Sequence, residues 1–124
     1  MHQWFIYREF DQASEAAADF IADKITESIQ KNGICHVALP GGKTPAICLG
    51  YLAEKSLPWN KVHWYLGDEH CLPQGDVERN DVMLEKHFWS KLSNAHVHVI
   101  PAELGADKAA EAYRQEISAV ATFD

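Results

Sequence analysis

Two short stretches of the chain place glycine and polar residues directly after an apolar run: LPGGKTP at 39–45 and LGDEHCLP at 66–73. In the first, Gly41 and Gly42 let backbone N–H groups approach a ligand closely, while Lys43 and Thr44 add an ammonium group and a hydroxyl. This pattern predicts an anion cradle. A tight strand-to-helix turn explains the same glycines equally well, because short glycine motifs are weak evidence. The stretch is not a P-loop, which has four residues between its glycines and then GK[ST].

The second stretch concentrates two carboxylates, an imidazole and a thiol in Asp68, Glu69, His70 and Cys71. Adjacent carboxylates in a cleft can act as acid and base, hold a hydroxylated substrate or orient a basic group. Consecutive residues rarely converge on one ion, so a polar loop is favoured over a metal site. Cys71 is not favoured as a nucleophile, because no base is visibly paired with it.

Four histidines lie in apolar runs typical of strands. His96 and His98 would point to the same side of a strand, which is a chelating arrangement, but no third ligand is evident. His36 and His63 fall in core runs and are expected to be hydrogen-bonded structural residues. We therefore predict a polar strand face rather than a metal site.

The first half of the chain alternates between strand and helix patterns. Residues 4–10 are rich in aromatic and β-branched types and predict a strand, and a helix follows with Asp11 as its N-cap. Asn32-Gly33 marks the end of that helix, and residues 34–39 predict a buried strand. The expected inner face of the helix repeats at three- and four-residue steps: Ala13, Ala17, Phe20, Ile21, Ile25 and Ile29.

The pattern continues with a helix from Thr44, a good N-cap ahead of Pro45, to about Lys55. Residues 62–66 predict the next strand, and a polar loop follows to about Arg79. Asn80 is expected to cap a helix, and residues 96–100 are expected to form a short strand. Asp107 is expected to cap a last helix. The expected inner faces of these two helices are Met83, Leu84, His87 and Phe88, and then Ala106, Ala110, Tyr113, Ile117 and Val120.

This alternation predicts one α/β domain over 1–124, with a Rossmann-like parallel sheet and helices on both faces. Apolar runs such as ICHVAL and VHWYL suit strands that are buried on both sides. In such sheets the carboxyl ends of parallel strands meet at one edge, where ligands bind. The two polar stretches are therefore expected to form one site.

Composition limits the classes of partner. A net charge of −7 argues against general attraction to nucleic acid or to anionic membranes, but not against a small anionic ligand. No apolar run reaches the length of a membrane span, and nothing resembles a signal peptide. The three cysteines show no disulfide spacing, so we expect a cytoplasmic protein.

Four segments together are similar to the amino-terminal half of the 6-phosphogluconolactonase family, from about residue 10 onward: LPGGKTP, LPWNKVHWYLGDEHCLP, ERNDVM and IPAELGADKAAEAY. The wider group includes glucosamine-6-phosphate deaminases, whose related loop also carries an Asp-Glu pair. The resemblance implies hydrolysis of 6-phosphogluconolactone to 6-phosphogluconate in the pentose phosphate pathway, without metal or organic cofactor. It implies a sugar-phosphate ligand bound by Gly41, Gly42, Lys43, Thr44, Asp68, Glu69, His70, Arg79 and Asn80.

The chain departs from the family pattern at three points. Pro40 and Lys43 flank the glycine pair where the family commonly has other residues. His70 stands where the family usually has arginine, which binds phosphate through two parallel hydrogen bonds and stays charged. The family's general base, a histidine in an Asp-Gly-His motif, matches none of the seven histidines. We therefore expect a truncated domain that lacks the family's general base.

Three functions remain open from the sequence. The leading one is a lactonase of which this chain holds the amino-terminal part. The others are an amino-sugar-phosphate isomerase or deaminase, and a non-catalytic module for sugar-phosphate binding or interaction. A parallel sheet that stops after these strands would leave an apolar edge, so self-association is also expected.

Overall fold

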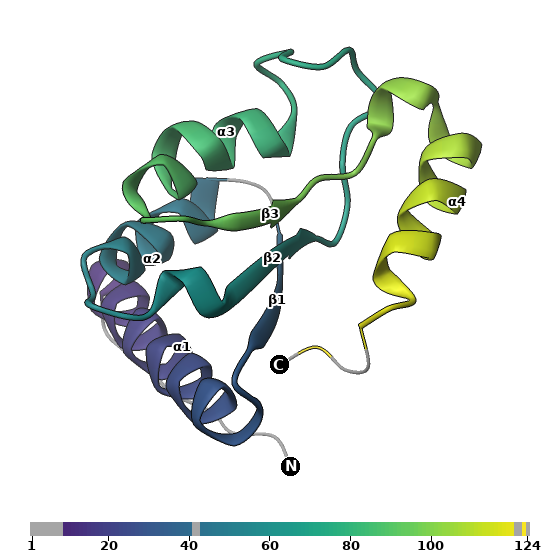
Figure 1. The fold of residues 1–124 in the computed structure, drawn as a ribbon. Coiled ribbons are helices and arrows are strands. Elements are labelled where there is room, and N and C mark those ends of the chain that lie inside the picture. Colours follow the sequence, from purple (N-terminus) through teal and green to yellow (C-terminus); the bar gives the residue numbers. More distant parts are fainter. Residues whose placement is uncertain (1–8, 41–42, 121–122, 124) are drawn as a thin grey trace.

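The computed structural model describes residues 9–40, 43–120 and 123. Its sheet has three parallel strands in the order β1-β2-β3, with bounds Cys35–Leu39, Val62–Leu66 and His96–His98 (Figure 1). The helices are α1 (Phe10–Asn32), α2 (Lys43–Ala53), α3 (Asn80–His87) and α4 (Ala106–Ile117). Three short 3-10 turns lie between them: η1 (Trp59–Lys61), η2 (Trp89–Lys91) and η3 (Ala102–Leu104). The predicted α/β class with parallel strands is confirmed.

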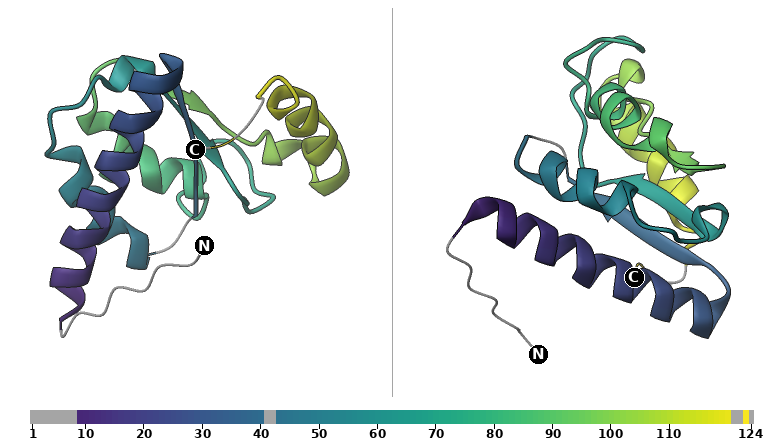
Figure 2. Two further views of the ribbon diagram at one scale, coloured as in Figure 1. Left: turned by 90° about the horizontal axis from the view of Figure 1, so that it is seen from below. Right: turned by 90° about the vertical axis from the view of Figure 1, so that its left-hand side faces the viewer.

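The sheet has helices on both sides (Figure 2). Helices α1, α2 and α3 lie on one side and share a core with it, in which Trp64 and Phe88 are fully buried and meet edge to face at 5.1 Å. Helix α4 stands on the other side, where Tyr113 is its main buried residue. The core is therefore concentrated between the sheet and the first three helices.

Helix α1 differs from expectation at its start and along its inner face. Residues 4–8 of the predicted first strand lie outside the described residues, and Phe10 already belongs to the helix. Asp11 is not the N-cap, because its carboxylate instead accepts a hydrogen bond from the Tyr51 hydroxyl at 2.6 Å. Small residues, Ser14 and Ala18, face the core instead of the predicted Ala17 and Phe20, because they allow α1 to pack closely on its neighbours.

The predicted end of α1 is confirmed. Gly33 adopts a left-handed conformation with φ of 77°, and its N–H donates to the carbonyl of Ile29 at 2.7 Å. Glycine enters this conformation without the steric cost that a Cβ imposes. The chain can therefore turn directly into β1.

Other predicted helix boundaries shift by one or two residues. Helix α2 begins at Lys43 rather than after a Thr44 cap, and it ends at Ala53 because the next amides bond in a tighter turn. Gly105 holds the cap position of α4, and Asp107 lies in its first turn.

Two inner faces also differ from expectation. His87 of α3 is exposed, and in α4 Ala109 is buried whereas the predicted Ala106 and Ala110 are exposed. The boundaries of α2 and α4 shift because the short polar stretches at the helix ends carry too little periodic signal to determine where a helix begins or ends.

No helix in the described ranges is long and apolar enough to cross a membrane.

Leu52 provides a test of the core. Its side chain is fully buried, so Leu52→Ala should lower the free energy of unfolding by about 2–5 kcal/mol through lost contacts and a residual cavity. Ile47 lies on the same helix but is 43% exposed, and Ile47→Ala should change stability by about 0.5 kcal/mol or less. Urea denaturation measures both, and equal effects would contradict this packing.

Candidate functional site

Strands β1 and β2 end side by side, which brings the two polar stretches to one edge of the sheet. Leu39 pairs with Leu66 in the parallel register, and the N–H of Gly67 donates to the carbonyl of Leu39 at 3.1 Å. Gly41 and Gly42 lie outside the described residues, as do the side chains of Lys43 and Thr44. Among the described residues, Leu39 and Leu66, with which the two stretches begin, lie side by side at this edge.

The two adjacent carboxylates have opposite environments. Asp68 is exposed, whereas the side chain of Glu69 is 0% exposed. Glu69 Oε1 accepts hydrogen bonds from the backbone N–H groups of His70 and Asn80 at 2.9 and 2.6 Å. Its Oε2 accepts one from the N–H of Asp81 at 2.9 Å. Glu69 therefore satisfies free amides at the start of α3 from outside the helix.

Asn80 lies next to Asp68 and does not cap α3 with its own side chain. Its Nδ2 donates to the backbone carbonyl of Asp68 at 3.2 Å and approaches the Asp68 carboxylate at 3.4 Å. The cap position belongs to Arg79, which has extended backbone. The predicted cap is wrong because the loop carboxylate of Glu69 already fills that function.

Arg79 is the most unusual residue of the group, because its side chain is only 1% exposed. Its Nε and Nη2 donate to the two oxygens of Asp81 at 3.0 and 2.9 Å. Nη1 donates to Glu103 at 3.0 Å and to the carbonyl of Leu72 at 3.2 Å, and Nη2 also reaches the carbonyl of Ile100 at 3.0 Å. A guanidinium has five N–H groups, so none remains for a ligand.

Electrostatics explains why Arg79 can be buried. Burial opposes its charge, but the hydrogen bonds to Asp81 and Glu103 outweigh this cost and raise the pKa of Arg79 above its usual value. A backbone hydrogen bond and then the bond from Arg79 lower the pKa of Glu103. Glu69 lies 4.0 Å from the Arg79 Nε and adds a third carboxylate. The expectation that Arg79 contacts substrate directly therefore does not agree with this geometry.

Two hollows flank the loop that follows β2. One of about 400 Å³ lies against α4 and is lined by Asp68, Cys71 and an alanine-rich helix face. The other, of about 510 Å³, lies between α2 and α3 and is lined by Asn80, Met83 and Ile47 among others. Ligand pockets in proteins commonly have volumes of roughly 300–1,000 Å³. Asp68 thus borders one hollow and Asn80 the other, whereas His70 is exposed but lines neither.

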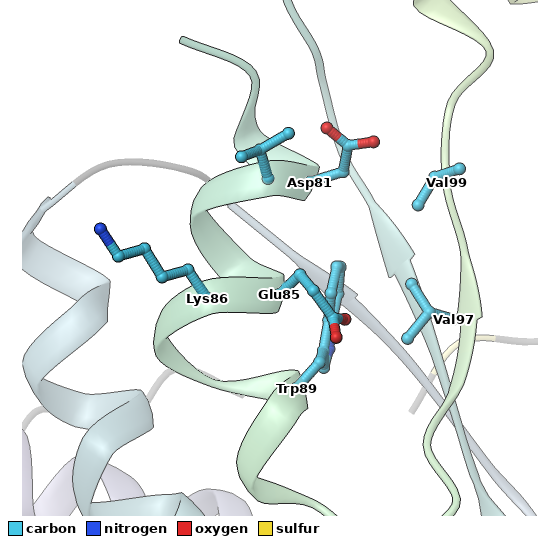
Figure 3. A pocket seen from close by; sticks show the side chains of 7 residues that line it. Asp81, Glu85, Lys86, Trp89, Val97 and Val99 are labelled. Carbon is cyan, nitrogen blue, oxygen red and sulfur yellow. The ribbon is translucent and has the colours of Figure 1, made fainter. Parts of the chain in front are cut away.

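A third hollow, of about 530 Å³, lies between α3 and β3. Figure 3 shows Asp81 and Glu85 on the side of α3 that faces Val97 and Val99, whereas Lys86 points away. None of the residues predicted to bind substrate lines this hollow. It is therefore separate from the candidate site.

The histidines form a connected polar face on the sheet. His63 Nδ1 and His98 Nε2 are 2.9 Å apart, and His98 Nδ1 lies 2.7 Å from the Glu116 carboxylate. His36 Nδ1 is 3.2 Å from the Tyr65 hydroxyl, and the ring of His96 stacks on His63 with centroids 4.6 Å apart. The prediction that His36 and His63 are hydrogen-bonded structural residues is confirmed. In the described part of the chain, no group of three or more His, Cys, Asp or Glu side chains is arranged to hold a metal ion.

The histidine face of the sheet disfavours a positive charge on His63. Burial, followed by the nearby His96, His98 and His36, lowers the pKa of His63 below its ordinary value of 6.5. In the hydrogen bond between the two imidazole nitrogens one donates and the other accepts, so the two rings cannot both be protonated at these atoms. The folded chain thus holds His63 neutral at a pH where the unfolded chain would protonate it.

Stability should consequently fall in mild acid. As the pH drops below about 6.5, the unfolded state binds a proton that the folded state resists, and the loss levels off below the folded pKa of His63. Urea unfolding between pH 8 and pH 5 should show this decline, and His63→Gln should reduce its slope. The exposed His87 provides the control, since His87→Gln should keep the slope of the unchanged chain. An unaltered slope in His63→Gln would contradict the assignment.

Sequence reasoning placed Asp68, Glu69, Arg79 and Asn80 in one group, and the structure brings all four together. Sequence reasoning did not identify Asp81 and Glu103, which bind Arg79. Glu103 is 24 residues away from Arg79 along the chain, and no local pattern links the two.

Comparison with known proteins identifies the family of this chain. Residues 8–124 match the family model described as glucosamine-6-phosphate isomerases/6-phosphogluconolactonase. A 6-phosphogluconolactonase of Thermotoga maritima is 34% identical over 113 residues, which cover 86% of this chain and 51% of that protein. One from Streptomyces coelicolor is 30% identical, covering 94% of this chain and 49% of that protein.

The fold comparison gives the same result. The crystal structure of a 6-phosphogluconolactonase from Shewanella baltica superposes with a TM-score of 0.88 at 22% identity, covering 95% of this chain and 52% of that chain. The chain thus spans about half the length of the relatives it matches. It belongs to the family of glucosamine-6-phosphate isomerases and 6-phosphogluconolactonases.

Proposed function

We propose that this chain carries the phosphate-binding part of an enzyme that hydrolyses 6-phosphogluconolactone to 6-phosphogluconate, a step of the pentose phosphate pathway. The observation that supports this most is the parallel pairing of Leu39 with Leu66, because the two polar stretches begin with these residues in the sequence. Relatives that are 34% and 30% identical are named 6-phosphogluconolactonase.

The phosphate group would bind at residues 41–44. Gly41 and Gly42 allow close approach of backbone N–H groups, and Lys43 supplies a positive charge at the start of α2. Free amides and the helix dipole at this end favour an anion, and the Thr44 hydroxyl adds a donor. Asp68, His70 and Asn80 would meet the sugar hydroxyls from the opposite side.

Hydrolysis of the lactone requires a water molecule to add to the ester carbonyl while a base removes its proton. The ring C–O bond then breaks, and the ring oxygen takes up a proton. By resemblance, the base is the histidine of an Asp-Gly-His motif, and no such motif occurs in these 124 residues. We infer that this chain on its own binds the sugar phosphate but does not catalyse the reaction, and that it needs neither metal nor organic cofactor to bind.

Titration with 6-phosphogluconate, followed by NMR, tests the binding site. Lys43→Ala should weaken binding about tenfold or more, because a hydrogen bond to a charged group is lost. Lys108→Ala, on the exposed side of α4, removes the same charge elsewhere and should leave the affinity unchanged. Absence of binding by the unchanged chain would contradict the proposed function.

A lactonase assay on the same samples shows whether this chain catalyses the reaction by itself. Turnover no faster than spontaneous hydrolysis, together with binding, fits a phosphate-binding half that lacks the base. It also fits the second candidate, a non-catalytic sugar-phosphate-binding module. Turnover well above the spontaneous rate would show that another group in this chain activates water. Binding of glucosamine 6-phosphate in preference to 6-phosphogluconate would instead favour an isomerase or deaminase.

We further infer that the chain associates with itself through the side of strand β1 that does not face β2. Strand β1 pairs with β2 on one side, and no described strand pairs with its other side. An unpaired strand offers N–H and C=O groups to a second copy. Size-exclusion chromatography should show a dimer or larger species that dissociates on dilution, and a compact monomer at all concentrations would contradict the inference. A cytoplasmic location is part of the proposal, supported by three cysteines in the sequence that show no disulfide spacing.

A further inference from the structure

We propose that Glu69 and Arg79 position the candidate site without touching the ligand, and that Asp68 and Asn80 are the groups that they present to it. The proposal rests on the proposed sugar-phosphate site and divides the adjacent Asp68-Glu69 pair between two tasks. One carboxylate faces the open edge, and the other is built into the protein.

The hydrogen bonds of Glu69 commit its carboxylate to the protein backbone. Both of its oxygens accept backbone N–H groups, from His70 and Asn80 on Oε1 and from Asp81 on Oε2. The carboxylate is also fully buried. A buried anion held by consecutive amides at a helix start is stabilised by the positive end of the helix dipole. Its geometry is thus that of a cap supplied by the loop.

This cap determines where Asp68 and Asn80 lie. Asp68 immediately precedes Glu69, so fixing the Glu69 side chain restricts the backbone that carries Asp68. Asn80 is held through its own N–H at 2.6 Å, and its Nδ2 then reaches Asp68 at 3.2 Å. The exposed Asp68 and the half-buried Asn80 are therefore both attached to one buried carboxylate.

Arg79 completes the arrangement by fixing the loop from the other side. Its guanidinium joins three separate parts of the chain: the loop carbonyl of Leu72, Asp81 in α3, and Ile100 and Glu103 ahead of α4. It also balances the carboxylates of Glu69, Asp81 and Glu103 around it. Lysine would keep the charge but lacks the planar set of five directed N–H groups.

Glu69→Gln and Arg79→Lys test the proposal, because each keeps the approximate shape of the side chain while removing hydrogen bonds. Without ligand, the Asn80 side-chain amide signals in NMR should move to the positions typical of free asparagine, and their exchange with water should accelerate. With 6-phosphogluconate, the Kd of Glu69→Gln should rise about tenfold, as expected when a helix cap is lost and its loop loosens. Arg79→Lys should show both effects to a smaller degree.

Ile25→Ala is the matched control for stability alone. Ile25 is 2% exposed in α1 and contacts none of the site residues through a hydrogen bond, so its loss should lower the melting temperature. The folded fraction should nevertheless bind 6-phosphogluconate with an affinity within about twofold of the unchanged chain. A rise in Kd for Ile25→Ala equal to that for Glu69→Gln would show that the effect is only one of stability, and would overturn the proposal.

Two further outcomes are decisive. Unchanged Asn80 signals and unchanged Kd in both Glu69→Gln and Arg79→Lys would overturn the positioning role. If the unchanged chain does not bind 6-phosphogluconate at all, the proposed function fails. The Asn80 amide signals then decide by themselves whether Glu69 holds Asp68 and Asn80 in place.

Discussion

The burial of one guanidinium, that of Arg79, is the constraint on which the candidate site depends. A buried charge is tolerated only when hydrogen bonds and opposite charges replace water, and Arg79 obtains them from three segments of the chain. Those segments are the loop after β2, the first turn of α3 and the turn before α4. Because one guanidinium bonds to all three, these segments are held together as a unit.

The three segments joined by Arg79 also determine which polar side chains are exposed at the carboxyl end of β2. Glu69 lies beside Arg79 and holds the start of α3, and the neighbouring Asp68 remains exposed at the end of β2. A pair of adjacent carboxylates in the sequence therefore becomes one structural group and one accessible group. The difference arises because consecutive residues after a strand point in different directions, and only one of them can enter the protein.

The sequence predicted the parallel sheet and the shared edge, because apolar runs of strand length alternate with helical periods. It also predicted the glycine end of α1, since Gly33 needs a left-handed backbone. It did not separate the tasks of Asp68 and Glu69, and it placed Arg79 among ligand-binding residues. Both depend on the distant Glu103 and on which side chains are buried, which no local pattern encodes. The starts of α1 and α3 differ from the predicted ones because the side chains of Asp11 and Asn80 form hydrogen bonds with Tyr51 and Asp68 and do not cap their own helices.

A crystal structure of this chain with 6-phosphogluconate would test the central claim most directly. The account predicts the phosphate against residues 41–44 and sugar oxygens near Asp68 and Asn80, with Glu69 and Arg79 keeping their hydrogen bonds within the protein. A structure in which the Arg79 guanidinium leaves Asp81 and Glu103 and binds the phosphate directly would contradict it.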